Sequence, residues 1–367
     1  MVFLLNASNL KNGGGLQVAQ SICGQLARFE QHHFVIILSS YIDDSCIEFG
    51  SNATVYHYDI KNNIKTLLFG RDVFLDGLIK EHRIDAVLTI FGPSRWIPRC
   101  AHLCGFARAQ LLLTDSPYYK RIGFKEKLVY RIWTWSFKRS SKVFYTENPY
   151  ISEMLPRLLG DVQVYSVTNY YNQVYDNPLQ WKRTITLPEF DGITCLSVSS
   201  SSPYKNLNIL IEVSRYLMKN YPDFKCRYVL TFPESEMSVP EDVMGNFLFI
   251  GKVNVNECPY LYEQADIMVM PTLMECFTAT YPEAMRMGVP IVTTDLEFAR
   301  GLCDDAACYY SAADPMDAAE AIYKVATDKK FANQLVENGK KQLLTYDNYE
   351  QRTEKLIKIL EEIAPRK

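Results

Sequence analysis

Two glutamates, Glu275 and Glu283, flank the run of small residues from Thr278 to Thr280. The apolar segment Ile267–Met270 comes before them and predicts a buried strand, whereas Pro282 predicts the first turn of a helix, where its missing N–H costs nothing. A strand, a loop of small residues and a helix N-terminus form an anion site that suits a diphosphate. The glutamates could then accept hydrogen bonds from the hydroxyls of a ribose and a sugar. The alternative is that both carboxylates only favour the helix N-terminus.

One lysine follows a second predicted strand. Ile193–Val198 is mostly apolar, as expected of a strand that is buried on both faces, and the serine-rich run Ser199–Ser202 leads from it to Lys205. An ammonium group at this position could neutralise a diphosphate as it becomes the leaving group. Ser200 is a candidate phosphate ligand, although a serine-rich turn before a helix is also typical of capping.

The first half of the chain holds three further candidates. Gly14 and Gly15 follow the first predicted strand and could approach phosphates, or they could serve only a tight turn. The dinucleotide pattern Gly-x-Gly-x-x-Gly that begins at Gly13 is incomplete, because Val18 takes the last position. His102 is the candidate for a group near a reacting sugar, but a lone histidine in an apolar run is more often part of the core.

Short apolar runs alternate with helical patterns along the chain, which predicts βαβ units, parallel sheets and the α/β class. The expected strands are Val2–Leu5, Phe34–Leu38, Ala86–Ile90, Ala109–Leu113, Lys142–Tyr145, Ile193–Val198, Tyr228–Thr231, Phe247–Ile250, Ile267–Met270 and Ile291–Thr293. The expected helices are Leu16–Phe29, Val73–Glu81, Asn206–Lys219, Pro259–Gln264, Pro282–Met287, Met316–Thr327, Phe331–Leu343 and Tyr349–Ile363.

The strand–helix pattern restarts after Leu187-Pro188, and 367 residues suit two domains. We expect a Rossmann-like domain over residues 1–185, a second over 186–345, and a last helix within 346–367 that packs back on the first. Ligands of such sheets bind at the carboxyl ends of the strands, so the predicted site is the cleft between the two domains.

The composition is that of a soluble globular protein, with 48% hydrophobic and 22% charged residues and a formal net charge of -3. This balance argues against a nucleic-acid-binding protein. The 10 cysteines include no Cys-x-x-Cys pair, which favours reduced thiols. The apolar start, Met1–Leu5, is too short for a signal peptide, and no run approaches the ~20 apolar residues of a membrane span. We therefore expect a cytoplasmic protein.

Glu275 and Glu283 are part of a longer residue pattern. Glu-x7-Glu followed by Ala-Met-x-x-Gly-x-Pro-Ile-Val, over residues 275–292, resembles the signature of family 4 retaining glycosyltransferases. These enzymes have the GT-B fold, in which two Rossmann-like domains face a cleft, and the resemblance covers residues 190–345. It implies that Glu275 contacts the donor sugar and that Glu283 binds the ribose. It also implies that the segment between them gives backbone donors to the diphosphate: Phe277, Thr278, Ala279 and Thr280.

A second segment resembles the same family. Ser199–Asn206 is similar to its Gly-Arg-x4-Lys-Gly/Asn element, with Lys205 in the place of the lysine. The arginine of that element is missing, so serine hydroxyls or a basic residue from elsewhere must replace it. Phe249–Val253 matches the segment near the nucleobase. Phe91–Ser94 and Cys104–Ala107 look like segments of bacterial surface-polysaccharide glycosyltransferases.

The resemblance implies transfer, with retention, from a nucleoside-diphosphate sugar to a saccharide. We expect UDP-sugar, with GDP-sugar possible, no cofactor, and no metal because no Asp-x-Asp is present. From Arg95 to Lys142, eleven Lys or Arg and several aromatics oppose two acidic residues. This predicts either contact with the inner face of an anionic membrane, near a lipid-linked acceptor, or a solvated helix. The alternatives are a nucleotide-sugar epimerase and a non-catalytic sugar-nucleotide-binding subunit.

Overall fold

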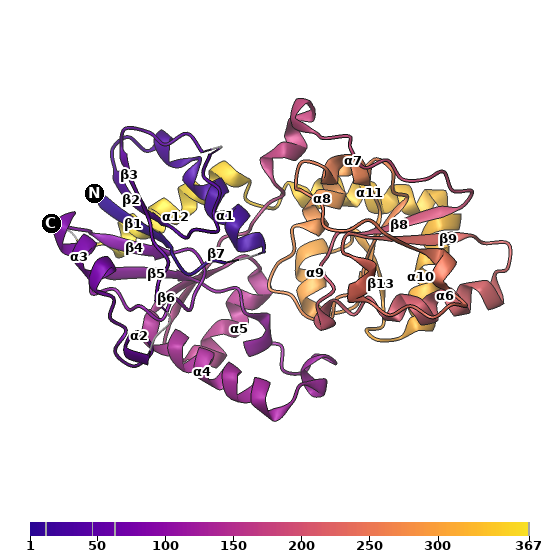
Figure 1. The fold of residues 1–367 in the computed structure, drawn as a ribbon, viewed down its shortest axis with the longest axis horizontal. Helices are drawn as coiled ribbons and strands as arrows, with labels where there is room; N and C mark the ends of the chain where they lie inside the picture. Colours follow the sequence, from indigo (N-terminus) through magenta and orange to yellow (C-terminus); the bar gives the residue numbers. More distant parts are fainter. Residues whose placement is uncertain (12, 46, 62–63, 366–367) are drawn as a thin grey trace. The chain divides into compact units, whose positions relative to one another are not determined.

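The computed structural model describes residues 1–11, 13–45, 47–61 and 64–365. The chain forms two compact units, and each contains one parallel sheet (Figure 1). The first unit comprises Met1–Leu112, Ile122–Asn169 and Asp347–Lys367. The second comprises Leu113–Arg121 and Tyr170–Tyr346. The chain therefore passes from one unit to the other more than once.

The first unit has a seven-stranded sheet in the order β3-β2-β1-β4-β5-β6-β7. Its strands are β1 Val2–Ala7, β2 His33–Leu38, β3 Ala53–His57, β4 Ala86–Thr89, β5 Ala101–Gly105, β6 Val143–Thr146 and β7 Gln163–Ser166. Its helices are α1 Gly14–Cys23, α2 Ile64–Phe69, α3 Val73–Glu81, α4 Phe124–Ser140, α5 Pro149–Leu159 and α12 Tyr349–Ile363. Successive side chains of β1 point to opposite faces: Phe3 and Leu5 pack in one core with α1 and α12, whereas Leu4 packs in another with α3.

The second unit has a six-stranded sheet in the order β10-β9-β8-β11-β12-β13. Its strands are β8 Ile193–Ser197, β9 Cys226–Leu230, β10 Phe247–Phe249, β11 Ile267–Met270, β12 Ile291–Thr294 and β13 Ala307–Tyr310. Its helices are α6 Ile209–Asn220, α7 Cys258–Tyr262, α8 Thr280–Met287, α9 Glu297–Cys303, α10 Pro315–Thr327 and α11 Lys329–Leu343. The strand order reverses between β8 and β11, and ligands of such sheets bind at this point.

One strand prediction is wrong. Ala109–Leu113 was expected to be a strand, but Ala109–Leu111 forms a short 3-10 helix, and β5 lies earlier in the chain. Ala109 and Leu111 are buried. The apolar run therefore indicates buried residues, and it does not indicate that their backbone is extended. The two edge strands of the first sheet, β3 and β7, and the strand β13 were not expected.

The boundary between the units lies after Asn169, earlier than the expected position near residue 185. The segment that follows it is held by the second unit. Asp176 pairs with Arg286 of α8 at 2.8 Å, and the backbone N–H of Lys182 donates to the carbonyl of Asn256 at 2.8 Å. These contacts explain why a composition change near Leu187 does not mark the structural boundary.

Helix α12 belongs to the first unit. Asn348 and Gln351 form a capping box at its start, and Leu356 and Leu360 join the core that contains β1 and α1. The chain thus returns to the first unit after it completes the second. Within the described residues, no helix combines the length and the apolar character that crossing a bilayer requires.

Candidate active site

Lys205 and Glu275 form an ion pair in the second unit. The Nζ of Lys205 lies 2.5 Å from the Oε1 of Glu275, and only 12% and 11% of the two side chains are exposed. The hydroxyl of Thr272 donates to the same carboxylate oxygen at 3.0 Å. Lys205 follows β8 and Glu275 follows β11, so the pair lies where the strand order reverses. The structure therefore brings together two predicted catalytic residues that are distant in the sequence.

The two loops that carry this pair are joined through their backbones. Pro203–Lys205 forms a 3-10 turn, which ends at Asn206 in the left-handed region with φ 54°. The carbonyl of Tyr204 accepts the N–H of Leu273 at 2.8 Å and the hydroxyl of Thr272 at 3.3 Å. These bonds fix the lysine loop against the glutamate loop, so the ion pair does not depend on the two side chains alone.

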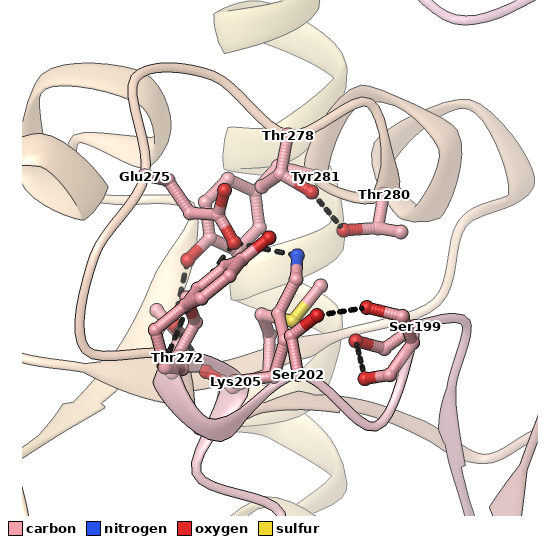
Figure 2. Close-up of polar contacts among 12 residues, drawn as sticks. Ser199, Ser202, Lys205, Thr272, Glu275, Thr278, Thr280 and Tyr281 are labelled. Atoms are coloured by element: carbon pink, nitrogen blue, oxygen red, sulfur yellow. Dashed lines mark hydrogen bonds and ion pairs between the residues drawn. The ribbon is translucent and has the colours of Figure 1, made fainter. Parts of the chain in front are cut away.

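The start of helix α8 supplies the second part of the site. Thr278 and Thr280 are 7% exposed, and their hydroxyls lie 2.8 Å apart. Figure 2 shows the Lys205 ammonium pointing toward the loop that carries these threonines. The first N–H groups of a helix have no intrahelical acceptor, and they carry the positive end of the helix dipole. The lysine and the helix start can therefore act on one anion.

The other residues of this loop lie beside the threonines. Ala279 is the N-cap residue of α8, and the ring of Phe277 contacts that of Tyr346 with centroids 6.4 Å apart. Phe277 and Ala279 are both partly exposed. The segment that was expected to present backbone donors is therefore held by packing on one side, and it remains accessible.

Glu283 is buried in the first turn of α8, with 6% of the residue exposed. Tyr262 donates a hydrogen bond to its carboxylate at 3.1 Å. Burial raises the pKa of Glu283 to about 7, while the hydroxyls of Tyr175 and Tyr262 act in the opposite direction. A carboxylate oxygen can accept more than one hydrogen bond, so Glu283 keeps the capacity to bind a hydroxyl.

Several groups of the serine run Ser199–Ser202 already form hydrogen bonds within the protein. The backbone N–H of Ser199 donates to Thr231 at 2.9 Å, and the hydroxyls of Ser200 and Ser202 lie 2.9 Å apart. The hydroxyl of Ser201 donates to Glu236 at 2.5 Å. Ser200 is exposed, so its hydroxyl can still bind a phosphate. Both interpretations of Ser200, as a ligand and as a turn residue, agree with this geometry.

Sequence analysis did not single out Arg121. This residue lines a cavity of about 210 Å³ together with Ser201 and Ser202. Its segment is anchored to the second unit, because the hydroxyl of Ser116 donates to the carbonyl of Leu273 at 2.7 Å. No local motif marks Arg121, and the basic run from Arg95 to Lys142 was the only signal that included it.

His102 lies in β5 and is 7% exposed. One ring nitrogen lies 2.9 Å from the hydroxyl of Thr89, and the other lies 2.7 Å from the carbonyl oxygen of Ser140. Burial lowers the pKa of His102 to about 4, so the ring is neutral near pH 7. Since both nitrogens are engaged inside the sheet, we assign His102 to the core, and not to the reacting sugar as the sequence suggested.

Gly14 and Gly15 begin helix α1 of the first unit, after β1. The positive φ of this turn, 72°, belongs to Gly13. Nothing lies within 4 Å of the place that a Cβ of Gly14 would take, whereas one on Gly15 would meet Leu10 and Phe91 at 3.4 Å. A Cβ at Gly15 would therefore only touch these two side chains at van der Waals distance, and Gly14 leaves the start of the helix open.

Comparison with known proteins agrees with this geometry. Residues 183–342 match the family described as "Glycosyl transferases group 1". An "Uncharacterized glycosyltransferase" of Haemophilus influenzae is 30% identical over 110 residues, which cover 29% of this chain and 31% of that protein. The match thus spans about a third of this relative. The residues that match the family model lie within the second unit.

Solved structures match nearly the whole chain. Sucrose-phosphate synthase from Thermosynechococcus elongatus is 13% identical, with a TM-score of 0.70 and 98% of each chain covered. WaaG, a glycosyltransferase involved in lipopolysaccharide biosynthesis, is 16% identical, with a TM-score of 0.70 and 98% of this chain and 99% of that one covered. At these identities the likeness concerns the fold. The protein has two Rossmann-like α/β domains of the GT-B kind.

Proposed function

We propose that this protein is a glycosyltransferase that moves a sugar from a nucleoside-diphosphate sugar to a saccharide acceptor, with retention at the anomeric carbon. The Lys205–Glu275 ion pair beside the start of α8 carries this proposal. The pair lies where a parallel sheet binds its ligand, within a glycosyltransferase group 1 domain. Retention follows from the resemblance to family 4 enzymes.

In the proposed reaction, the bond between the anomeric carbon and the diphosphate oxygen breaks, and its electron pair stays with the diphosphate. The acceptor hydroxyl oxygen bonds to the same carbon, and its proton passes to the released diphosphate. Lys205 and the first N–H groups of α8 stabilise the charge that develops on the leaving group. Glu275 holds Lys205 in position and accepts a hydrogen bond from a donor-sugar hydroxyl, while Glu283 accepts one from the ribose.

We further propose that no metal ion or cofactor is required. The carboxylate of Glu275 already balances the charge of Lys205, so a diphosphate needs more positive charge than this pair supplies. Arg121 is the cationic residue that shares a cavity with the serine run, and we propose that it replaces the missing arginine. Arg121→Ala should weaken nucleotide binding, whereas Lys120→Ala, which changes the neighbouring charge, should not. Equal effects of the two substitutions would remove this role.

The donor and acceptor proposals rest on the family resemblance. We propose a UDP-sugar, with a GDP-sugar as the alternative, and a lipid-linked saccharide of a surface polysaccharide as the acceptor. The structural likeness to a glycosyltransferase of lipopolysaccharide biosynthesis supports such an acceptor. The enzyme would then act in the cytoplasm, at the inner face of the cell membrane.

A thermal-shift screen of the protein against UDP, GDP, ADP, CMP and NAD tests the donor site. A ligand at 100 times its dissociation constant stabilises the folded state by about 2.7 kcal/mol. We expect one nucleoside diphosphate to raise the melting temperature of the wild type. The rise should be smaller in Lys205→Ala and unchanged in Lys329→Ala, which removes an exposed lysine of α11. A shift with NAD alone, or with none of the ligands, would contradict the proposal.

Turnover separates the proposed reaction from its alternatives. The donor sugar should appear on an added saccharide, and nucleoside diphosphate should be released only when the acceptor is present. Conversion of the donor to an isomeric nucleotide sugar without acceptor would instead indicate an epimerase. Nucleotide binding without turnover on any saccharide or lipid-linked acceptor would indicate a non-catalytic subunit.

A further inference from the structure

Helix α4 exposes large apolar side chains that the first unit does not cover. The exposed fractions are 81% for Phe124, 49% for Leu128, 42% for Val129, 39% for Ile132 and 42% for Trp135. A surface helix of a globular protein normally turns its apolar face toward the core. The first three turns of α4 instead hold their apolar groups in solvent.

Four of these five side chains form a stripe that faces away from the core. Phe124, Leu128 and Ile132 are spaced four residues apart and Trp135 follows three residues later, so they share one face of the helix. The buried residues of α4 include Phe137, which the helical period places on the opposite side. The helix therefore has one apolar face for its own core and a second for an external surface.

Basic residues border the exposed stripe. Helix α4 contains five Lys or Arg and one Glu, a net charge of +4, although the whole chain has a formal net charge of -3. The helical period places Lys127, Arg131 and Lys138 on one side of the stripe and Lys125 and Arg139 on the other. An apolar stripe between two rows of cations is typical of a helix that lies in the interface of an anionic bilayer.

A second apolar group adjoins the end of α4. The guanidinium of Arg139 donates to the carbonyls of Leu67 and Leu68 in α2, at 3.2 Å and 2.7 Å, and it lies 4.2 Å from the ring centroid of Trp135. The side chains of α2 and of the start of α3 are also exposed: 71% for Ile64, 49% for Leu68, 68% for Phe69 and 91% for Val73. We call these residues, with the stripe and the basic residues of α4, the α2–α4 face, because α2 lies beside the end of α4 (Figure 1).

We propose that the α2–α4 face docks on an anionic lipid bilayer and holds the protein there without spanning it. The stripe supplies apolar side chains for the boundary between headgroups and acyl chains, and the bordering cations supply attraction to anionic headgroups. No helix in the described ranges can cross a bilayer, so the attachment lies in the membrane plane. This inference rests on the proposed function in one respect, because a lipid-linked acceptor gives the enzyme a reason to be at that surface.

Co-sedimentation of the full chain with vesicles tests the docking. The probes are vesicles of phosphatidylcholine alone and vesicles that also contain phosphatidylglycerol. We expect binding to the anionic vesicles that weakens as salt is added, and at least about tenfold weaker binding to the neutral ones. Leu128→Ser/Ile132→Ser and Lys125→Glu/Lys127→Glu should each reduce binding at least about tenfold, because the first removes apolar contact and the second reverses two charges.

Matched controls lie on the second unit. Leu344→Ser removes an apolar side chain that is 85% exposed, and Lys329→Glu/Lys330→Glu reverses two exposed lysines; both variants should bind like the wild type. All variants should keep the wild-type melting temperature and the shift with nucleoside diphosphate, so loss of docking can be told from failure of the donor site.

Three results would overturn the proposal. They are equal binding to neutral and anionic vesicles, equal loss in the control variants, and a dimer that the α2–α4 variants dissociate without any binding to vesicles. The last result would assign the face to a second copy of the chain.

Discussion

The two units have the same kind of parallel sheet, but they use the charged residues at its carboxyl edge differently. In the second unit, Lys205 and Glu275 follow β8 and β11, form one ion pair and remain 12% and 11% exposed. In the first unit, Glu147 follows β6 and interacts electrostatically with Arg352 of α12. These two residues are 5% and 2% exposed.

The buried guanidinium of Arg352 connects distant parts of the chain. Arg352 donates hydrogen bonds to Asn169, where the first unit ends before the chain enters the second, and to Ser21 of α1 at 2.7 Å. Burial raises the pKa of Glu147 to about 7, and the charge of Arg352 acts against this rise. In the first unit a buried cation thus holds the last helix in place through hydrogen bonds, whereas the charges at the carboxyl edge of the second sheet can meet a ligand. A shared fold therefore does not give its charged residues a shared role.

The largest effect should come from removing the buried guanidinium of Arg352. Arg352→Met removes its hydrogen bonds to Asn169 and Ser21 and leaves the buried Glu147 without the cation that favours its charged form, which should cost roughly 3–5 kcal/mol of stability. Urea denaturation measures this loss. Arg28→Met is the matched control, because the Arg28–Glu350 pair has side chains 53% and 50% exposed, and exposed pairs contribute little. If both substitutions had the same small effect, the position of α12 would not depend on Arg352.

The next largest effect should concern catalysis. Lys205→Ala should reduce turnover by roughly 10²–10³, since one electrostatic donor to a developing charge supplies about 2.7–4 kcal/mol. Lys205→Arg should restore part of the rate, and Lys329→Ala, which removes an exposed lysine of α11, should change it little. Wild-type turnover by Lys205→Ala would show that the second unit does not use its pair as we propose.

A smaller effect should appear in the pH dependence of stability. The folded-state pKa of Glu283, about 7, lies above its ordinary value of 4.5, so the folded protein binds the proton more tightly. Stability from this group is full below about pH 4.5 and is lost as the pH rises through about 7. Between about pH 5 and pH 7.5 the loss amounts to about 2 kcal/mol.

Unfolding of Glu283→Gln in urea at the two pH values tests this dependence. The variant should lose less stability with rising pH than the wild type, because its side chain does not titrate. Glu241→Gln, at an exposed position, should keep the wild-type dependence. If the stability of Glu283→Gln fell with rising pH as steeply as that of the wild type, the Glu283 carboxyl would be ionised throughout the range.

The smallest expected effect is that of chelation. If Lys205, Arg121 and the start of α8 neutralise the leaving diphosphate, removal of divalent cations with a chelator should leave the transfer rate unchanged. Initial rates with and without the chelator check this expectation. A strict requirement for Mn²⁺ would contradict a leaving group that is stabilised by protein charges alone.

Local periodicity was enough to predict several elements with their bounds. β11, α3 and α12 begin and end where the sequence predicts, over Ile267–Met270, Val73–Glu81 and Tyr349–Ile363. A continuous apolar run or a helical stripe reports which face is buried, and here burial and backbone conformation agree. Burial and backbone conformation disagree at Ala109–Leu113, where an apolar run forms a 3-10 turn. At β3, the partly exposed residues give only a weak strand pattern.

The sequence by itself determined the part of the candidate site that is contiguous. Glu275, the small residues before α8, and Glu283 lie on one strand–loop–helix unit, whose anion-binding character comes from local backbone geometry. Only the tertiary structure decided that Lys205 meets Glu275, that Arg121 lines a cavity with the serine run, and that His102 is a core residue. The order of the strands and the packing of the side chains determine these positions, and local residue spacing predicts neither.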